Sequence, residues 1–526
     1  MIRVRQIKVE VDKDNETYLK EKIIKKLKIN NNDLISYEIN KKSIDARNKR
    51  EIYYVYEIDV ILKNEEKVKK DKDIFKVEKE EYIYPKVGNE LLTNRPVVVG
   101  SGPSGLFCAY LLSELGYNPI VIERGEKIED RIKTVNEFWE KGILNQNSNV
   151  CFGEGGAGTF SDGKLNTLVN DEQHRIEKIF DVFIHCGAPK EIKYLNKPHI
   201  GTDILRKVIV NLRNKIIKNG GEFRYNTTLT DIVVENNKIN KIIINNKEEL
   251  NCEVLLLAIG HSARDTIKML YNHKMDMTSK PFAVGVRIQH KQEMINNSQY
   301  GKFSKLLPNA SYKLTYKASN GRGVYTFCMC PGGFVVNSSC EKDHLIINGM
   351  SNYERNEENA NSAVVVTVGP SDFGNSPLDG LEFQRELENR AGYLGKGEIP
   401  TQLYKDYKNN MVSKEFKSVN PLFKGKYTFA NLNELFPDFI NESLKEGIEA
   451  FDKKIKGFAS DDAILSGVES RTSSAVRINR NELYESSING IYPIGEGAGY
   501  SGGITTSAID GLKVAEKIIE KYKSLN

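Results

Sequence analysis

The chain has 526 residues, of which 39% are hydrophobic and 28% charged, a balance that excludes an intrinsically disordered protein and fits two to four domains. Its 76 Lys and Arg residues against 71 Asp and Glu residues give a net charge of +5, so composition argues against a nucleic-acid partner. Seven scattered cysteines argue against a secreted disulfide framework. With neither a signal peptide nor a membrane-spanning stretch predicted, we expect a cytoplasmic protein.

A small α/β domain is predicted for residues 1–90. Residues 2–11 alternate apolar and charged side chains like a strand, and residues 18–27 have the spacing of an amphipathic helix. Residues 52–62, rich in Tyr, Val and Ile, predict a second strand. This unit is too small to hold a dinucleotide, so the nucleotide-binding residues are expected further along the chain.

A strand–turn–helix–strand unit follows the N-terminal domain. Residues 96–99 read as a short buried strand, residues 104–115 as a helix and residues 118–123 as a second strand. The sequence Gly-Ser-Gly-Pro-Ser-Gly at 100–105 spans the turn between the first strand and the helix. This order of elements predicts a parallel sheet of the Rossmann type.

Each glycine of that turn has a separate role in dinucleotide binding. Gly100 permits the tight turn, Gly102 leaves room for a pyrophosphate beside the backbone, and Gly105 lets the helix pack closely on the strand. Glu123 ends the second strand, where its carboxylate can accept hydrogen bonds from ribose hydroxyls and would repel a 2′-phosphate. The adenosine half is therefore expected to belong to FAD or NAD and not to NADP.

A second glycine-rich element near the C-terminus favours FAD over NAD. Residues 491–494 predict a strand that ends in Gly495-Glu496, and residues 497–503 lead into a closing helix at 504–522. A carboxylate there can bind a ribityl hydroxyl. The helix N-terminus can approach the flavin edge where negative charge gathers on reduction.

The rest of the chain predicts an interrupted FAD domain. Residues 221–227, 230–235 and 238–244 read as an antiparallel meander, and residues 251–259 as a buried strand. The expected fold class is α/β: a discontinuous Rossmann-like FAD/NAD(P)-binding fold with an inserted β-rich substrate domain and the small N-terminal α/β domain. The predicted domains are residues 1–90 (N-terminal), 94–270 (FAD-binding, first part), 271–460 (inserted substrate domain) and 461–526 (FAD-binding, C-terminal part).

These motifs resemble those of the flavoprotein superfamily of the glutathione reductase and p-hydroxybenzoate hydroxylase type. The resemblance includes the Glu123-Arg124 pair and residues 255–260, where Ile259 replaces the Thr of the family's Ala-Thr-Gly motif. At Gly495-Glu496 a longer Glu stands where the superfamily has Asp.

A closer resemblance links nearly the whole chain to a group of bacterial FAD-dependent dehydrogenases. The matching segments are residues 43–47, 153–165, 327–333 and 469–474. This resemblance implies FAD as the cofactor but does not name a substrate.

The segment Gly153-Glu-Gly-Gly-Ala-Gly158 is formally a second dinucleotide motif, but no predicted helix follows it. We expect a loop along the FAD, with Lys164 placing a positive charge near the flavin; a glycine-rich surface loop remains the alternative. The residues expected to contact FAD are Gly100, Gly102, Pro103, Ser104, Gly105, Glu123, Arg124, Gly158, Ser161, Lys164, Gly260, Gly495, Glu496, Gly502, Gly503 and Ile504.

Several other side chains allow more than one interpretation. Cys328 and Cys330 should share one face of a strand, and structural thiols are favoured over a redox pair or metal ligands. Arg471 can hold a substrate carboxylate or belong to a salt-bridge network, and His261 can be a general acid or a hydrogen-bonded structural histidine. No cysteine or histidine has zinc-finger spacing, so no metal is expected, and no catalytic residue is assigned.

The sequence thus predicts an FAD-dependent oxidoreductase that transfers hydride through flavin N5 to or from a small-molecule substrate. NADH or NADPH stays open as a transient electron donor. A flavin monooxygenase of the same fold is the first alternative. A flavin-containing RNA-associated or scaffold protein, acting through residues 1–90, is the second. The oligomeric state is not predicted.

Overall fold

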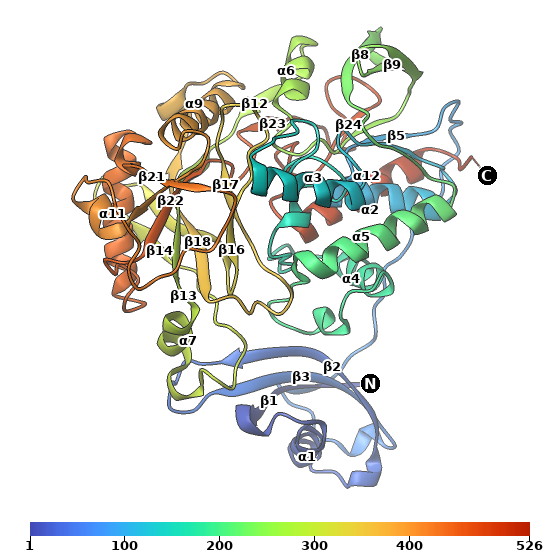
Figure 1. The fold of residues 1–526 in the computed structure, drawn as a ribbon. Helices are drawn as coiled ribbons and strands as arrows, with labels where there is room; N and C mark the ends of the chain where they lie inside the picture. Colours follow the sequence, from blue (N-terminus) through green and yellow to red (C-terminus); the bar gives the residue numbers. More distant parts are fainter. Residues whose placement is uncertain (526) are drawn as a thin grey trace.

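The structure, a computed structural model, describes residues 1–525 and has a mixed α/β architecture built around a parallel sheet (Figure 1). The parallel-sheet domain lies beside a β-rich domain, and a small N-terminal domain lies below both in this view. The predicted fold class is therefore confirmed.

The N-terminal domain is an antiparallel sheet in the order β2-β3-β1-β4 with one helix packed against it. Its elements are β1 (Ile2–Glu10), α1 (Glu16–Leu27), β2 (Leu34–Asp45), β3 (Tyr53–Leu62) and β4 (Ile74–Lys76). The strand β2 was not predicted from the sequence, because this edge strand is largely polar and lacks a clear apolar alternation. Backbone hydrogen bonds from Lys42 to Tyr194 and from Asn196 to Lys42, 2.7 and 2.9 Å long, join β2 to the parallel-sheet domain.

The parallel sheet has the order β24-β11-β5-β6-β7. Val98, Val121 and Leu256 pack on the helical face, whereas their chain neighbours pack on the other face, where the β8–β10 meander lies. The strands are β5 (Val97–Val99), β6 (Ile120–Ile122), β7 (Glu222–Arg224), β11 (Leu255–Leu257) and β24 (Ile491–Pro493). The helical face is covered by α2 (Pro103–Glu114), α4 (Arg175–His185), α5 (Gly201–Lys218) and α12 (Ile504–Lys521), and the domain also contains α3 (Ile128–Lys141) and α6 (Arg264–Asn272).

One strand of the predicted meander belongs elsewhere. Residues 221–227 were expected to pair with the strand that follows, but β7 pairs in parallel with β6 at the edge of the parallel sheet. The third strand of the meander is instead β10, which follows the other two. The meander consists of β8 (Leu229–Glu235), β9 (Lys238–Ile244) and β10 (Glu248–Asn251). Because β7 has three half-buried residues, its pattern does not reveal which sheet it joins.

The β-rich insert is centred on a seven-stranded sheet in the order β14-β15-β18-β13-β22-β19-β21, with α11 packed across β14, β15 and β18. The strands of this sheet are β13 (Phe282–Lys291), β14 (Thr315–Lys317), β15 (Gly323–Cys330), β18 (Asn359–Val368), β19 (Ile399–Leu403), β21 (Tyr427–Phe429) and β22 (Ile464–Glu469). The remaining strands are β12 (Met277–Ser279), β16 (Phe334–Asn337), β17 (Ile347–Met350), β20 (Phe423–Lys424) and β23 (Val476–Ile478). The helices are α7 (Gln292–Tyr300), α8 (Pro370–Phe373), α9 (Asp379–Leu394), α10 (Tyr404–Lys408) and α11 (Asp438–Asp452).

The chain returns to the parallel sheet later than residue 461, the boundary that the sequence predicted. β22 lies between β13 and β19 in the insert sheet, and β23 pairs with β12. The return therefore follows β23. No sequence pattern marks this point, because β22 is uniformly buried and a buried strand fits either sheet.

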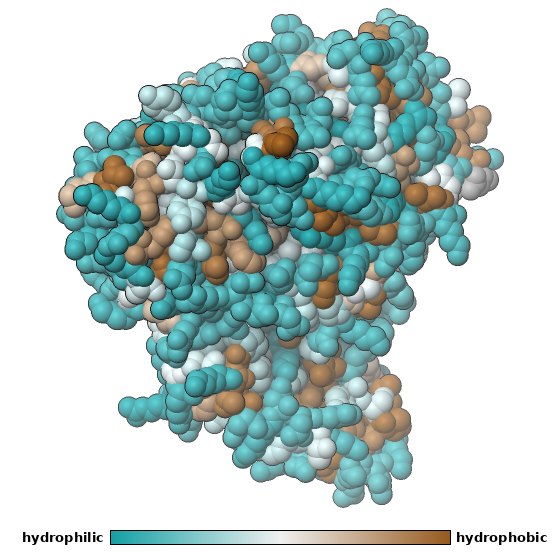
Figure 2. Space-filling model, viewed as in Figure 1, coloured by the Kyte–Doolittle hydropathy of each residue, from teal (hydrophilic) through white to brown (hydrophobic). Residues whose placement is uncertain are grey.

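The face of the molecule in Figure 2 is mainly hydrophilic, with small scattered apolar patches. Within residues 1–525, no helix combines the length and the apolar character needed to cross a bilayer.

Candidate functional site

A cavity of about 570 Å³ lies where the parallel-sheet domain meets the insert. Val99, Ile122 and Ala258, at the carboxyl ends of β5, β6 and β11, line one side. Residues 326–330 of β15 line another side. In open parallel sheets, ligands bind at the carboxyl ends of strands where the strand order reverses, and here the order reverses between β5 and β11.

The glycine turn before α2 forms one wall of this cavity. A Cβ atom on Gly100, whose φ is +98°, would lie 2.3 Å from the Ala258 carbonyl oxygen, and a Cβ on Gly105 would lie 2.0 Å from the Gly100 carbonyl oxygen. A Cβ on Gly102 would meet only the Gly156 Cα, at 3.8 Å. Packing therefore requires the outer two glycines, whereas Gly102 leaves open space where a pyrophosphate would lie. Pro103 and Ser104, at the start of α2, also line the cavity.

Glu123 lies beside the turn, but the protein already occupies its carboxylate. One oxygen accepts hydrogen bonds from the backbone N–H and hydroxyl of Ser101, at 2.9 and 2.7 Å. The other accepts from the N–H groups of Gly125 and Gly153, both at 3.0 Å. A carboxylate offers about four acceptor positions. The expected bonds from ribose would therefore have to share these oxygens or replace the Ser101 hydroxyl.

Arg124 is held at the cavity edge by protein contacts. Its guanidinium forms an ion pair with Asp265, 2.8 Å away, and lies 4.5 Å from the centre of the Phe152 ring. Arg124, Phe152 and Thr266 all line the cavity. A planar cation fixed in this way can border the adenosine end of a cofactor.

The C-terminal element also reaches the cavity. Gly502, Gly503 and Ile504 place the N-terminus of α12 at its wall, and Gly260 also lines the cavity. Gly495 does not line the cavity: its N–H donates to Asp510 at 2.7 Å, and a Cβ there would lie 2.4 Å from the Ser104 hydroxyl. Two helix N-termini, those of α2 and α12, thus offer unpaired N–H groups to one cavity.

Glu496 lines the cavity. Burial raises the pKa of its carboxyl to about 7, and Lys280 only partly opposes this shift. The carboxyl group that the sequence placed here therefore titrates near neutral pH. Either form of a carboxyl group can bond to a ribityl hydroxyl.

The second glycine-rich segment is a loop along the cavity, with a short 3₁₀ helix (Ala157–Phe160) and no long helix after it. Gly158, Ser161 and Lys164 all line the cavity. The Lys164 ammonium lies 3.0 Å from a carboxylate oxygen of Asp162, so its charge is paired inside the protein.

A buried arginine that was not predicted from the sequence shapes this loop. The Arg131 guanidinium donates to five backbone carbonyls, with distances between 2.7 and 3.1 Å. The accepting residues are Asn149, Val150, Gly153, Glu154 and Gly156. Arg131 is fully buried, yet its position in an amphipathic helix gives no sequence signal for this role.

Cys328 and Cys330 do not follow the alternation assumed for them. A register shift between Phe327 and Cys330 interrupts the pairing of β15 with β18, and Cys328 has a φ of +42°. Cys328 is exposed and Cys330 is buried, although both line the cavity. The two thiols therefore do not share one face of a regular strand, as the sequence analysis expected, because a bulge lies between the two residues.

We expect the Cys328→Ser, Cys330→Ser double variant to keep its FAD and any measurable turnover. The bulge leaves the two thiols in different environments, which does not favour a bond between them. Flavin absorbance per chain and turnover with a disulfide acceptor are the measurements. A folded double variant that loses flavin reoxidation by that acceptor would contradict the prediction.

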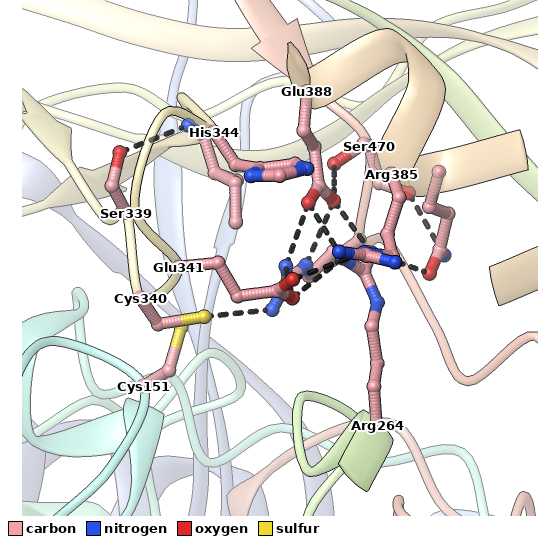
Figure 3. A network of polar contacts seen from close by, with 12 residues as sticks. Cys151, Arg264, Ser339, Cys340, Glu341, His344, Arg385, Glu388 and Ser470 are labelled. Atoms are coloured by element: carbon pink, nitrogen blue, oxygen red, sulfur yellow. Dashed lines mark hydrogen bonds and ion pairs between the residues drawn. The ribbon is translucent and has the colours of Figure 1, made fainter. Parts of the chain in front are cut away.

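Arg471 lines the cavity, but protein carboxylates already bind its guanidinium. Its guanidinium makes two hydrogen bonds to Glu388, at 2.8 and 2.7 Å, and lies 3.2 Å from Glu341. Arg264 also pairs with Glu388, and Figure 3 shows the resulting network. The salt-bridge interpretation therefore fits Arg471, because the N–H groups of its guanidinium that would bind a substrate carboxylate already bind Glu388.

His261 lines the cavity with its Nδ1 3.8 Å from Glu496. Burial, with the nearby charges of Arg471 and Arg264, lowers the pKa of His261 to about 3. The imidazole is therefore neutral at pH 7, which makes it a poor general acid.

Comparison with known proteins decides the family. An uncharacterized protein from Clostridium beijerinckii is 49% identical over 531 residues, and the alignment covers 99% of each chain. The chain belongs to the family of this clostridial protein. Residues 281–472 match the family described as FAD-dependent protein, C-terminal domain-like, and residues 98–144 match an NAD(P)-binding Rossmann-like domain. Residues 1–61 match a domain of unknown function. FAD is thus confirmed as the cofactor of this flavoenzyme family, and the open turn at Gly102 fits its pyrophosphate.

Two solved flavoprotein structures show a weaker likeness. L-proline dehydrogenase from P. horikoshii is 14% identical, with 84% of this chain and 96% of that chain covered and a TM-score of 0.34. Glycine oxidase from Bacillus cereus is 11% identical, with 82% and 98% covered and a TM-score of 0.32. Likeness at this level does not assign an activity.

Proposed function

We propose that the protein is an FAD-dependent dehydrogenase or reductase that transfers hydride between flavin N5 and a small-molecule substrate. One observation carries the proposal: the cavity that begins at the glycine turn of the parallel sheet continues to β15 of the insert. A cofactor held at the first end would share one enclosure with a substrate held against the second. When bound, FAD supplies the redox chemistry.

The chain's own residues then bind, orient and exclude water. The N-termini of α2 and α12 would hold the anionic and electron-rich parts of FAD, since helix N-termini carry a partial positive charge. The insert covers the cavity with Thr326, Phe327 and Met329. Substrate binding by this wall would place the reacting carbon next to the cofactor and away from solvent.

The proposal is tested by anaerobic reduction of the bound flavin. The holoprotein is mixed with candidate donors, including any small molecule that is retained during purification and identified by mass spectrometry. We expect a specific donor to bleach the flavin absorbance and an added acceptor dye to restore it. A flavin that no donor reduces, although dithionite does, would contradict the proposal.

A nicotinamide donor is expected to bind weakly. Within residues 1–525, the structure has one five-stranded parallel sheet, and in this proposal FAD occupies its glycine turn. NADH would therefore rest transiently in the substrate part of the cavity and compete with substrate in a ping-pong pattern. Stopped-flow flavin reduction against NADH and NADPH concentration measures this. Tight saturation that substrate does not disturb would reveal a separate nucleotide site.

A further inference from the structure

Two cysteines from different domains meet at the wall of the cavity. Cys151 lies in the loop after α3, and Cys340 lies in the insert after β16. Their side chains point toward each other in Figure 3, and the Cys151 thiol donates a hydrogen bond to the carbonyl of Ser338, two residues before Cys340, at 3.4 Å. Cys151 lines the cavity, whereas Cys340 lies behind it and is 1% exposed. One thiol therefore faces the cavity, and the other faces that thiol.

A charged cluster lies beside this pair. It contains three guanidinium groups, from Arg264, Arg385 and Arg471, and three carboxylates, from Glu341, Glu382 and Glu388. Nη1 of Arg471 lies 3.0 Å from Sγ of Cys340, so the cluster meets the cysteine pair at an arginine. A thiolate in the pair would lie against this guanidinium, and a nearby positive charge favours the ionised form of a thiol.

The surroundings of the pair lower the pKa of the Cys151 thiol, so this thiol ionises more readily than an isolated one. The hydrogen bond with Cys340 lowers the pKa of Cys151, and the charge of Arg471 lowers it further, although burial raises it. The same hydrogen bond raises the pKa of Cys340. Since the first proton lost belongs to the pair, one thiolate forms while the other sulfur keeps its hydrogen. A thiolate next to a second thiol is the arrangement that thiol–disulfide chemistry uses.

We propose that Cys151 and Cys340 are a redox-active dithiol/disulfide couple that exchanges an electron pair with the FAD; this inference rests on the proposed function. In the oxidising direction, the two S–H bonds break and one S–S bond forms. The two thiols give up two electrons and two protons. Oxidised FAD accepts both electrons and one proton, and the other proton leaves to solvent. The reverse reaction reduces the disulfide with the electrons of reduced FAD.

A reductive titration of the holoprotein tests this proposal. The protein is first oxidised with glutathione disulfide and freed of it, and is then titrated anaerobically with dithionite while the flavin absorbance is followed. We expect about four electrons per FAD, because flavin and disulfide each take about two. The Cys340→Ser variant should take about two. The Cys252→Ser variant, which changes another cysteine of 1% exposure, should take about four.

Mass spectrometry detects the disulfide between Cys151 and Cys340 directly, without relying on the flavin absorbance. Samples from the oxidised and reduced ends of the titration are blocked with N-ethylmaleimide and digested. A peptide linked through Cys151 and Cys340 should be present at the oxidised end and absent at the reduced end. If Cys340→Ser does not fold, Cys151→Ser provides the same comparison.

The two readouts separate the inference from the proposed function. A wild-type titration that takes about two electrons, with both cysteines alkylated after oxidation, would overturn the couple while leaving the flavoenzyme proposal intact. A linked peptide in a protein whose FAD no substrate donor reduces would contradict the proposed function instead.

Discussion

Replacing Gly102 by Val is expected to give a folded protein that binds FAD about 100-fold more weakly or worse, a loss of about 2.7 kcal/mol. A Cβ at this position meets protein only at 3.8 Å, and the backbone is extended, with φ −71° and ψ −178°. The added side chain would therefore occupy the space where a pyrophosphate would approach the turn. The fold itself should tolerate it. Flavin absorbance per chain after purification, with the dissociation constant of added FAD, is the measurement.

The chain offers a matched control for this substitution. Gly369 also precedes a proline at the start of a helix and has an extended backbone, and a Cβ there would lie 3.9 Å from its nearest neighbour, Pro281. It does not line the cavity. Gly369→Val should therefore keep its FAD. Equal FAD content in the two variants would refute the assignment of the turn at 100–105.

Replacing Glu388 by Gln is expected to lower the free energy of unfolding by about 3–5 kcal/mol at neutral pH, the usual cost of removing one partner of a buried ion pair. Glu388 is fully buried between Arg471 and Arg264. Burial alone would raise the pKa of its carboxyl, but the charges and hydrogen bonds of the two arginines hold it well below its usual range. The amide cannot neutralise either guanidinium. The midpoint of thermal unfolding, measured with and without FAD, tests this.

The pH dependence follows from the direction of that shift. A carboxyl group whose pKa falls on folding stabilises the folded state above its unfolded pKa, about 4.3, and loses this contribution as the pH falls toward the folded pKa. The gap between wild type and Glu388→Gln should therefore be constant from about pH 6 to 8 and shrink below about pH 4. The control is Glu382→Gln, whose side chain is 65% exposed and whose effect should stay within about 0.5 kcal/mol. A gap that persists undiminished in acid would contradict this explanation.

The sequence predicted the parallel-sheet core because its signals are local. The glycine turn at 100–105, the apolar strand before it and the helix after it lie within a few residues of one another, and each has a strong pattern. The insert was predicted as β-rich, but the place where the chain leaves it was not. Which sheet accepts β22 depends on β13 and β19, which lie far away in the sequence.

The candidate site likewise contains residues whose roles the sequence could predict and residues whose roles it could not. Gly102 and Gly503 could be placed from motifs, since their roles depend on backbone geometry next to a helix start. The roles of Arg131, Arg471 and Cys340 depend on partners brought close only by folding. A lone arginine or cysteine looks the same in sequence whether it binds a ligand or a buried neighbour. For that reason the sequence left both interpretations of Arg471 open, and the contacts with Glu388 favour the salt-bridge network.

The most direct test of the proposed dehydrogenase or reductase function is the rate at which the reduced flavin reacts with air. The holoprotein is reduced anaerobically, then mixed in one experiment with oxygenated buffer and in another with an acceptor dye. We predict fast reoxidation by the dye and slow reoxidation by oxygen. Rapid reoxidation by oxygen, coupled to the formation of a hydroxylated product, would contradict the proposed function and identify a monooxygenase.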